Sequence, residues 1–405
     1  MRLYEVALAF ALIGLALYTV LGGADFGAGF WQLVAGKGPR ADEIRDHAHH
    51  AMAPVWEANH VWLIFVLTVV WTAYPIAFGS IASTLSVPLF VAGIGIILRG
   101  GSYALRTGTT TRREQRTVDT VFAVSSLLTP FALGAAVGGI ASGRVGVGNP
   151  GGSLVTSWLN PTSIAIGALA VGSAAYTAAV FLSGDAARHG HAELAERFRL
   201  RALVSGVAAG GLAAVGLVVL RFDAHRLFTR LVSGPGLPAL VVSLLAGIGT
   251  LTLVRRRRYE PARYTAALAV AATIAGWALA QNPLFLEGLT VRQAAAGRDT
   301  QVAVVVAVVA GGVLLFPSLA LLFRLTLAGR LSEAEPAGPH ADHRRPVPRA
   351  GGWTRRLAAA SLVAGIGFLT VADDPAAHAV GIVFFLLFVA FGFRAALPAD
   401  LGLDG

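Results

Sequence analysis

The chain is dominated by long apolar runs that are separated by short polar segments. A helix that crosses a bilayer core of about 30 Å needs roughly 17 to 25 predominantly apolar residues. Runs that meet or approach this length lie near residues 6–24, 61–78, 81–98, 121–140, 164–182, 202–220, 237–254, 264–280, 302–323, 357–372 and 377–393. The eighth, tenth and eleventh runs are short, and the last two could form a hairpin that only partly crosses. The pattern therefore predicts nine to eleven membrane spans.

One long polar segment lies near the end of the chain. Residues 328 to 352 read AGRLSEAEPAGPHADHRRPVPRAGG, which is rich in Pro, Gly, Ala and charge and has no apolar period. Such a composition cannot bury enough apolar surface to fold, so we expect a disordered cytoplasmic linker over residues 326–356. No segment predicts a soluble catalytic domain. Any chemistry is therefore expected inside the bilayer, at its surfaces or on a partner.

The cationic side chains are unevenly distributed between the two sides of the predicted spans. Segments that follow odd-numbered runs hold 25 of the 32 Lys and Arg residues, and the other side holds 7. Because cytoplasmic loops carry the excess of Lys and Arg, the N-terminus is predicted outside and the C-terminus in the cytoplasm. The formal charge of +10 suits anionic lipid at that face and gives no reason to expect nucleic acid.

Composition agrees with a polytopic membrane protein. The 405 residues are 55% hydrophobic and 13% charged, which lies outside the range of soluble globular domains. There are no cysteines, so disulfides, thiolate metal sites and cysteine-ligated iron–sulfur clusters are excluded. The N-terminal stretch is followed by GGADFGAGFW, a poor cleavage region, so we expect an uncleaved first span.

Asp25 lies after the first apolar run, where an ionisable side chain is costly if it stays at membrane depth. It is surrounded by Gly22, Gly23, Gly27 and Gly29, which permit either close helix approach or a break in the helix. The simpler alternative is that Asp25 has reached the interface and is solvated. The following FGAGFWQLVAG stays apolar, which favours a position below the surface if the helix continues.

A second polar group opens the next run, in PVWEANHVWL. On a helix Trp56, Asn59 and His60 share a face, and Glu57 precedes His60 by three residues, so these two can share a proton or a hydrogen bond. A carboxylate in a half-apolar setting is well suited to passing protons. The alternative is that Trp56 and Trp62 form an interfacial aromatic belt and the polar side chains face headgroups.

Two further polar features, a histidine-rich segment and Arg99, can each be explained without a functional role. RDHAHHAM contains His47, His49 and His50, which could ligate a metal or haem, but it precedes the apolar run and fits a solvated interfacial helix. Arg99 ends the third run in ILRGGSYALR, where an arginine often anchors a helix end by snorkelling.

Taken in chain order, these motifs resemble subunit II of the cytochrome bd-type quinol oxidases. GGADFG is similar to the family's acidic glycine-rich motif after its first helix, PVWEANHVWL to its P-V-W-D-G-N-E-V-W-L segment, and ILRGGSYALR to its third-helix motif. SWLNPTSIAIGALA and NPLFLEGLTVRQAAAGRDT resemble the segments before the fifth and ninth helices. The resemblance covers about residues 1–325 and implies an all-α, nine-helix membrane bundle. Residues 357–405 would add a hairpin of about two transmembrane helices.

The departures from the family pattern are specific. Glu57 stands where the family usually has aspartate, Ala58 where it has glycine and His60 where it has glutamate. Gly22 replaces the first acid of the first motif, and Ala104 stands where a glutamate is usual. The chain is thus a divergent member, and its partner or substrate can differ from the family's.

The resemblance implies an accessory subunit of a respiratory oxidoreductase that passes electrons from ubiquinol or menaquinol to oxygen. This chain would bind no haem or other metal, because haem b and haem d-type groups are held by a homologous subunit I, its partner in a heterodimer. Subunit II would stabilise that partner and line a path for cytoplasmic protons.

The same resemblance assigns the candidate residues. Glu57 is expected to carry protons, His60 to relay them and Asp25 to be a second acid on the route. The residues expected at the interface with the partner are Trp56, Asn59, Trp62 and Arg99.

Two other function classes stay open on the sequence. One is a secondary transporter with broken helices and midplane acids, and the other is a structural subunit of a different membrane complex. For each, the expected location is a bacterial or archaeal plasma membrane with lipid around the bundle.

Overall fold

The computed structural model describes residues 2–36, 38–106, 112–148, 153–327, 352–371 and 375–396. Its helices are α1 (Leu3–Leu33), α2 (Pro39–Ala73), α3 (Pro75–Thr84), α4 (Ser86–Arg106), α5 (Arg112–Ala141), α6 (Pro161–Arg188), α7 (Ala192–Asp223), α8 (His225–Val232), α9 (Leu237–Arg255), α10 (Tyr259–Gln281), α11 (Val291–Ala294), α12 (Arg298–Leu327), α13 (Gly352–Val371) and α14 (Pro375–Ala396). Two short antiparallel strands, β1 (Leu284–Leu286) and β2 (Leu289–Thr290), form a hairpin. The predicted all-α class is confirmed.

The helices have the length and hydropathy of membrane spans. Within the described residues, six of them can cross a bilayer by length and composition: α1, α5, α6, α7, α9 and α10. A seventh span is possible if the bent pair of α2 and α3 counts as one. The chain is therefore a multi-pass membrane protein, while the expected total of nine to eleven spans stays a prediction.

The second predicted span ends earlier in the structure than the hydropathy pattern indicated, and a bend follows it. The second run was expected to reach residue 78, but α2 ends at Ala73 and α3 leaves it at an angle of 119°. Pro75 explains the break, because a proline disfavours helical geometry at the preceding residue, and Tyr74 has φ −140° and ψ 59°. The apolar helix that follows, α4, accordingly starts at Ser86 rather than near residue 81.

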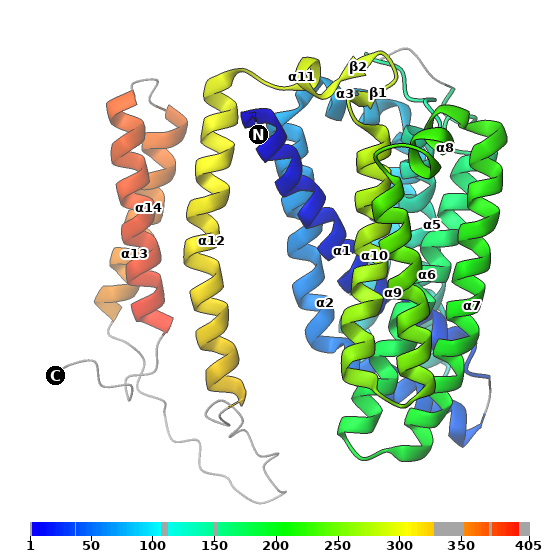
Figure 1. Ribbon diagram of the computed structural model, residues 1–405. Coiled ribbons are helices and arrows are strands. Elements are labelled where there is room, and N and C mark those ends of the chain that lie inside the picture. Colours follow the sequence, from blue (N-terminus) through cyan, green and yellow to red (C-terminus); the bar gives the residue numbers. More distant parts are fainter. Residues whose placement is uncertain are drawn as a thin grey trace, which may run out of the picture. The chain divides into compact units, whose positions relative to one another are not determined.

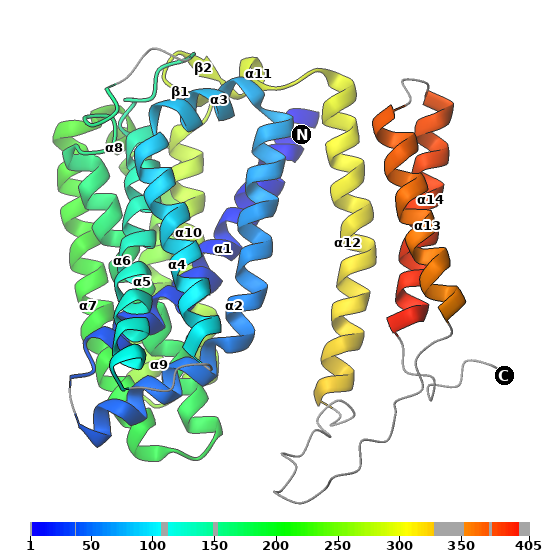
Figure 2. The same cartoon turned by 180° about the vertical axis from the view of Figure 1, so that it is seen from behind.

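Contacts divide the chain into two units, Met1–Phe316 and Pro317–Gly405, with the division falling inside α12. In the first unit α1 contacts α2, α5, α6 and α10, so it lies at the centre of the bundle. Figures 1 and 2 show α3, α8, α11 and the hairpin at one end of this bundle, and the α9–α10 turn at the other. In the second unit α13 packs along α14, with Phe368 stacked on Phe384.

Glycines of α1 set how closely its neighbours approach. A Cβ at Gly27 would lie 1.9 Å from the carbonyl oxygen of Ala174 in α6, and one at Gly29 would lie 2.2 Å from the Ser126 hydroxyl in α5. Helix α1 continues unbroken through both positions. Of the two sequence alternatives, these glycines therefore serve close helix approach, of α1 to α6 and to α5.

Candidate functional site

A buried ion pair between Asp25 of α1 and Arg99 of α4 forms the centre of the candidate site. Asp25 is 1% exposed and Arg99 2% exposed. The guanidinium of Arg99 engages both carboxylate oxygens: Nη1 donates to Oδ2, and Nη2 donates to Oδ1 at 2.6 Å. Nη2 also donates to the Asp25 carbonyl oxygen at 2.9 Å. This two-pronged geometry is the strongest form of an arginine–carboxylate contact.

Two more helices contribute hydrogen bonds to the pair. Asn59 of α2 is fully buried and donates from Nδ2 to Asp25 Oδ2 at 2.9 Å. Ser126 of α5 accepts from Nε of Arg99 at 2.9 Å and donates its own proton to the Phe122 carbonyl at 2.6 Å. The four side chains therefore join α1, α2, α4 and α5 through one polar cluster, which we call the Asp25 cluster.

Aromatic rings enclose the charged end of Arg99. Its guanidinium carbon lies 4.9 Å from the ring centre of Phe26 and 4.6 Å from that of Phe122. These rings exclude water and contribute cation–π attraction, which is strongest where the cation is desolvated. The charges are thus held in a low-dielectric setting, where an ion pair is favourable only if additional hydrogen bonds satisfy its polar groups.

The geometry settles two alternatives that the sequence left open. Asp25 is not solvated at an interface, because its carboxylate is enclosed within the bundle. Arg99 does not snorkel to the surface, because its whole side chain turns inward onto Asp25. Both residues stand inside helices that continue beyond them, so their charges lie within the protein interior.

Unpaired polar atoms remain beside the Asp25 cluster. Within the described part of the chain, the buried atoms without a hydrogen-bond partner include Asn59 Oδ1 and the Tyr18 hydroxyl. Tyr18 precedes Asp25 by seven residues, on the same face of α1, and interacts electrostatically with both Asp25 and Arg99. An unpaired buried oxygen is costly, so these two atoms mark places where a water molecule or a proton donor would be favourable.

The remaining candidate residues lie on α2 next to Asn59. His60 and Trp62 are half-buried, and Trp62 meets Phe65 edge to face at 6.1 Å between ring centres. The backbone at Trp56 and Glu57 is helical, whereas their side chains lie outside the described residues. The predicted contact of Glu57 with His60 therefore stays a prediction.

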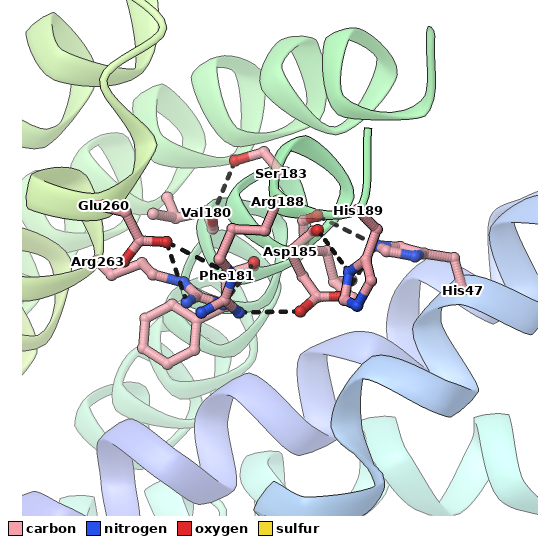
Figure 3. Close-up of polar contacts among 10 residues, drawn as sticks. His47, Val180, Phe181, Ser183, Asp185, Arg188, His189, Glu260 and Arg263 are labelled. Carbon is pink, nitrogen blue, oxygen red and sulfur yellow. Dashed lines mark hydrogen bonds and ion pairs between the residues drawn. The ribbon is translucent and has the colours of Figure 1, made fainter. Parts of the chain in front are cut away.

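His47 belongs to a second polar cluster, at the end of α6 (Figure 3). Its side chain is 9% exposed, and Nε2 lies 3.1 Å from the Leu182 carbonyl oxygen and 4.0 Å from Asp185 Oδ2. His189 Nδ1 lies 3.4 Å from the same Asp185 oxygen. Burial lowers the pKa of His47, and the smaller effect of the Leu182 and Asp185 oxygens opposes it. The expected solvated helix is therefore partly enclosed here; the side chains of His49 and His50 are outside the described residues.

The second cluster extends to α10 through arginine side chains. Arg188 bonds Asp185 at 2.9 Å and lies 3.6 Å from Glu260, which is also 3.6 Å from Arg263 (Figure 3). Arg263 in turn donates to the Phe181 carbonyl at 3.1 Å. Most of these groups reach the surface, so the ion pairs contribute little stability individually. Among the described residues, no group of three or more His, Asp and Glu side chains has the geometry to hold a metal ion.

Sequence reasoning missed Ser126, Asp185 and His189. Ser126 gives no signal, because a serine that bonds the carbonyl four residues before it is ordinary in an apolar helix. Asp185 and His189 were recognisable as a helical i, i+4 pair in DAARHGH, at the end of the fifth run.

Comparisons with known proteins agree with the fold and with the family resemblance. The family model for cytochrome bd terminal oxidase subunit II matches residues 3–326. A Bacillus subtilis (strain 168) protein that carries the provisional name cytochrome bd menaquinol oxidase subunit II is 21% identical over 238 residues, which is 57% of this chain and 67% of the relative. A chain in the structure of bd oxidase from Geobacillus thermodenitrificans is 25% identical, with a TM-score of 0.62 over 81% of this chain and 99% of that one. This chain therefore belongs to the cytochrome bd terminal oxidase subunit II family.

Proposed function

We propose that this chain is the haem-free subunit of a bd-type quinol oxidase and stabilises the haem-bearing subunit I. The observation that carries this proposal is the Asp25 cluster, which ties α1, α2, α4 and α5 together far from any solvent. A buried, hydrogen-bonded charge pair fixes the relative positions of these helices, because displacement of α1 or α4 leaves a charge unpaired and displacement of α2 or α5 removes a hydrogen bond to the pair. A fixed helix face is what a permanent partner subunit requires.

We propose that Asn59 and Arg99 support the partner subunit without touching it. Asn59 and Arg99 were expected at the interface, but this chain's own helices bury them. They would act by holding α2 and α4 in place, while Trp62 and Trp56 are left as candidates for direct contact. Haem b and haem d-type groups would lie on that partner, and quinol, as ubiquinol or menaquinol, would be the substrate of the complex.

We also propose that α2 lines a proton path from the cytoplasm, with Glu57 as the carrier and His60 as a relay. The position of Asn59 supports this, because it connects this part of α2 to the buried anion Asp25. Asp25 itself is engaged on both oxygens by Arg99. Its part in the path would be to hold Asn59, and with it this part of α2, in a fixed position beside the route.

The arrangement in the membrane completes the proposal. The arginine-rich ends would face the cytoplasm, with the N-terminus outside and the C-terminus inside. Residues 1–325 would form the family unit, residues 326–356 a linker, and residues 357–405 an additional hairpin.

The proton path is tested by Glu57→Gln in the assembled complex. Glutamine keeps the shape and hydrogen bonding of glutamate but removes the titratable group. Quinol-dependent oxygen consumption is expected to fall by about 100-fold or more, in the range of a lost proton-transfer group, while the haem spectra stay unchanged. Glu57→Asp should retain most of the activity, because aspartate is the family's usual residue there.

The control for this test is His60→Gln, which is expected to lower turnover less than Glu57→Gln does. A Glu57→Gln complex with normal haem spectra and full turnover would contradict the path. It would leave the stabilising role standing, because that role rests on the Asp25 cluster.

A further inference from the structure

A groove lies between α7 and α9, at the end of the bundle where the α9–α10 turn is found. It is open on one side and offers about 740 Å³ of space. Its wall is formed by aliphatic side chains of both helices, including Leu203, Val207, Ile248 and Leu251. Val207 and Ile248 are 67% and 54% exposed. On a helix that crosses a bilayer, such an exposed aliphatic wall faces lipid chains.

Arginines form the rim of this groove. Arg199, Arg255 and Arg256 line it, and Arg257 and Arg258 follow in the same turn. Arg199 and Arg257 share one carboxylate, that of Glu196. Arg255 and Arg256 are exposed and have no ion pair or hydrogen bond from their side chains among the described residues. Two uncompensated positive charges therefore stand at the mouth of an aliphatic groove.

The backbone holds the arginines at this mouth. Helix α9 ends in a turn in which the Arg258 amide bonds the Leu253 carbonyl and the Arg257 amide bonds the Val254 carbonyl. This is the Schellman pattern, in which the residue at the left-handed position is usually glycine. Here Arg257 takes that position, with φ 58°. The helix therefore stops directly after Arg255, and the arginines that follow are held beside the groove in an ordered turn.

We propose that this groove binds an anionic phospholipid. Its phosphate would lie between the guanidinium groups of Arg255 and Arg256, and one acyl chain would lie along Leu203, Val207, Ile248 and Leu251. The charges identify the headgroup: a zwitterionic lipid brings no net charge to neutralise the two free arginines, whereas phosphatidylglycerol or cardiolipin does. The aliphatic wall identifies a lipid rather than a soluble phosphate. The site does not involve Glu57 or the Asp25 cluster.

The experiment measures lipid binding to the membrane-extracted complex that contains the full chain. After removal of bound lipid in detergent, native mass spectrometry would follow titration with phosphatidylglycerol and with phosphatidylcholine of the same acyl chains. We expect phosphatidylglycerol to bind preferentially, and Arg255→Gln/Arg256→Gln to weaken it about 30-fold, since each arginine contributes about 1 kcal/mol to anionic-lipid attraction. A photoactivatable phosphatidylglycerol should label peptides that contain residues 199–207 or 248–256.

The matched control is Arg292→Gln/Arg298→Gln, which removes the same charge from exposed positions at the opposite end of the bundle. It should bind phosphatidylglycerol as the wild type does. Equal binding of the two lipids by the wild type, equal loss in both double variants, or labelling confined to other peptides would overturn the proposal. The lipid preference and the labelling use the wild-type complex, so they decide the question even if the Arg255/Arg256 variant does not assemble.

Discussion

Asp25 is the residue on which the contacts of the candidate site converge. Arg99 and Asn59 both donate hydrogen bonds to its carboxylate, and the Ser126 hydroxyl accepts one from Nε of Arg99. Removing one member of a buried ion pair strands the other charge in a low dielectric, whereas replacing both with neutral groups removes the desolvation cost as well. Single and double replacements at this pair should therefore differ sharply.

We predict that Asp25→Asn destabilises the assembled complex by about 3–5 kcal/mol. The double change Asp25→Asn with Arg99→Gln should recover a large part of this loss, because no charge is left unpaired. The measurement is thermal inactivation of the purified complex, followed by its haem absorbance. If the single and double variants are equally unstable, the pair has no electrostatic coupling and the stabilising role assigned to it is wrong.

The sequence identified three of the four members of the Asp25 cluster, all but Ser126, and did not show their association. Asp25, Asn59 and Arg99 stood out because polar side chains next to apolar runs are unusual and because they match family motifs. Nothing in the sequence pairs residues that lie 34 and 74 positions apart. Burial was also unpredictable for Arg99, because an arginine at the end of an apolar run has the same sequence pattern whether it snorkels outward or turns inward.

Among the elements, the helices were predictable because the thickness of the bilayer fixes the length of each apolar run. The connections were not, because they depend on local backbone geometry. The break at Tyr74 had a signal in Pro75, but hydropathy continued across it and hid the turn. The short amphipathic helix α8 was likewise too brief for a span pattern. The glycines of α1 indicated close helix packing, but the sequence did not show which helices pack against them.

The close approach of α1 to α6 gives an element-scale prediction. Gly27→Ala should destabilise the complex by about 1–3 kcal/mol, because the new methyl group would overlap the Ala174 carbonyl and force the helices apart. The matched control is Gly93→Ala in α4, where no atom lies within 4 Å of the added carbon. That change should be neutral or stabilise the helix by up to about 1 kcal/mol. Thermal unfolding of both variants measures the difference, and equal midpoints would refute the packing argument.

At the scale of the whole molecule, the orientation rests on the uneven distribution of arginine. The chain has no cysteine, so a single introduced thiol can be labelled without background. Val147, an exposed residue between α5 and α6, should react as Val147→Cys only from outside the cell. His340→Cys, in the segment outside the described residues, should react only from the cytoplasm. Membrane-impermeant maleimide on intact cells and on inverted vesicles makes the measurement, and the opposite pattern would reverse the topology.

The bend after α2 would also set the depth of Glu57 in the bilayer. The apolar part of α2 runs from Asn59 to Ala73, which is only about 22 Å of helix. A hydrocarbon core of about 30 Å needs about 20 residues, so it must extend back along α2 to about residue 54 unless the bilayer thins. The backbone of Glu57 would then lie about one turn inside the hydrocarbon boundary. Hydrophobic mismatch, with the far end of α2 set by the break before Pro75, would thus hold the backbone of Glu57 below the hydrocarbon boundary.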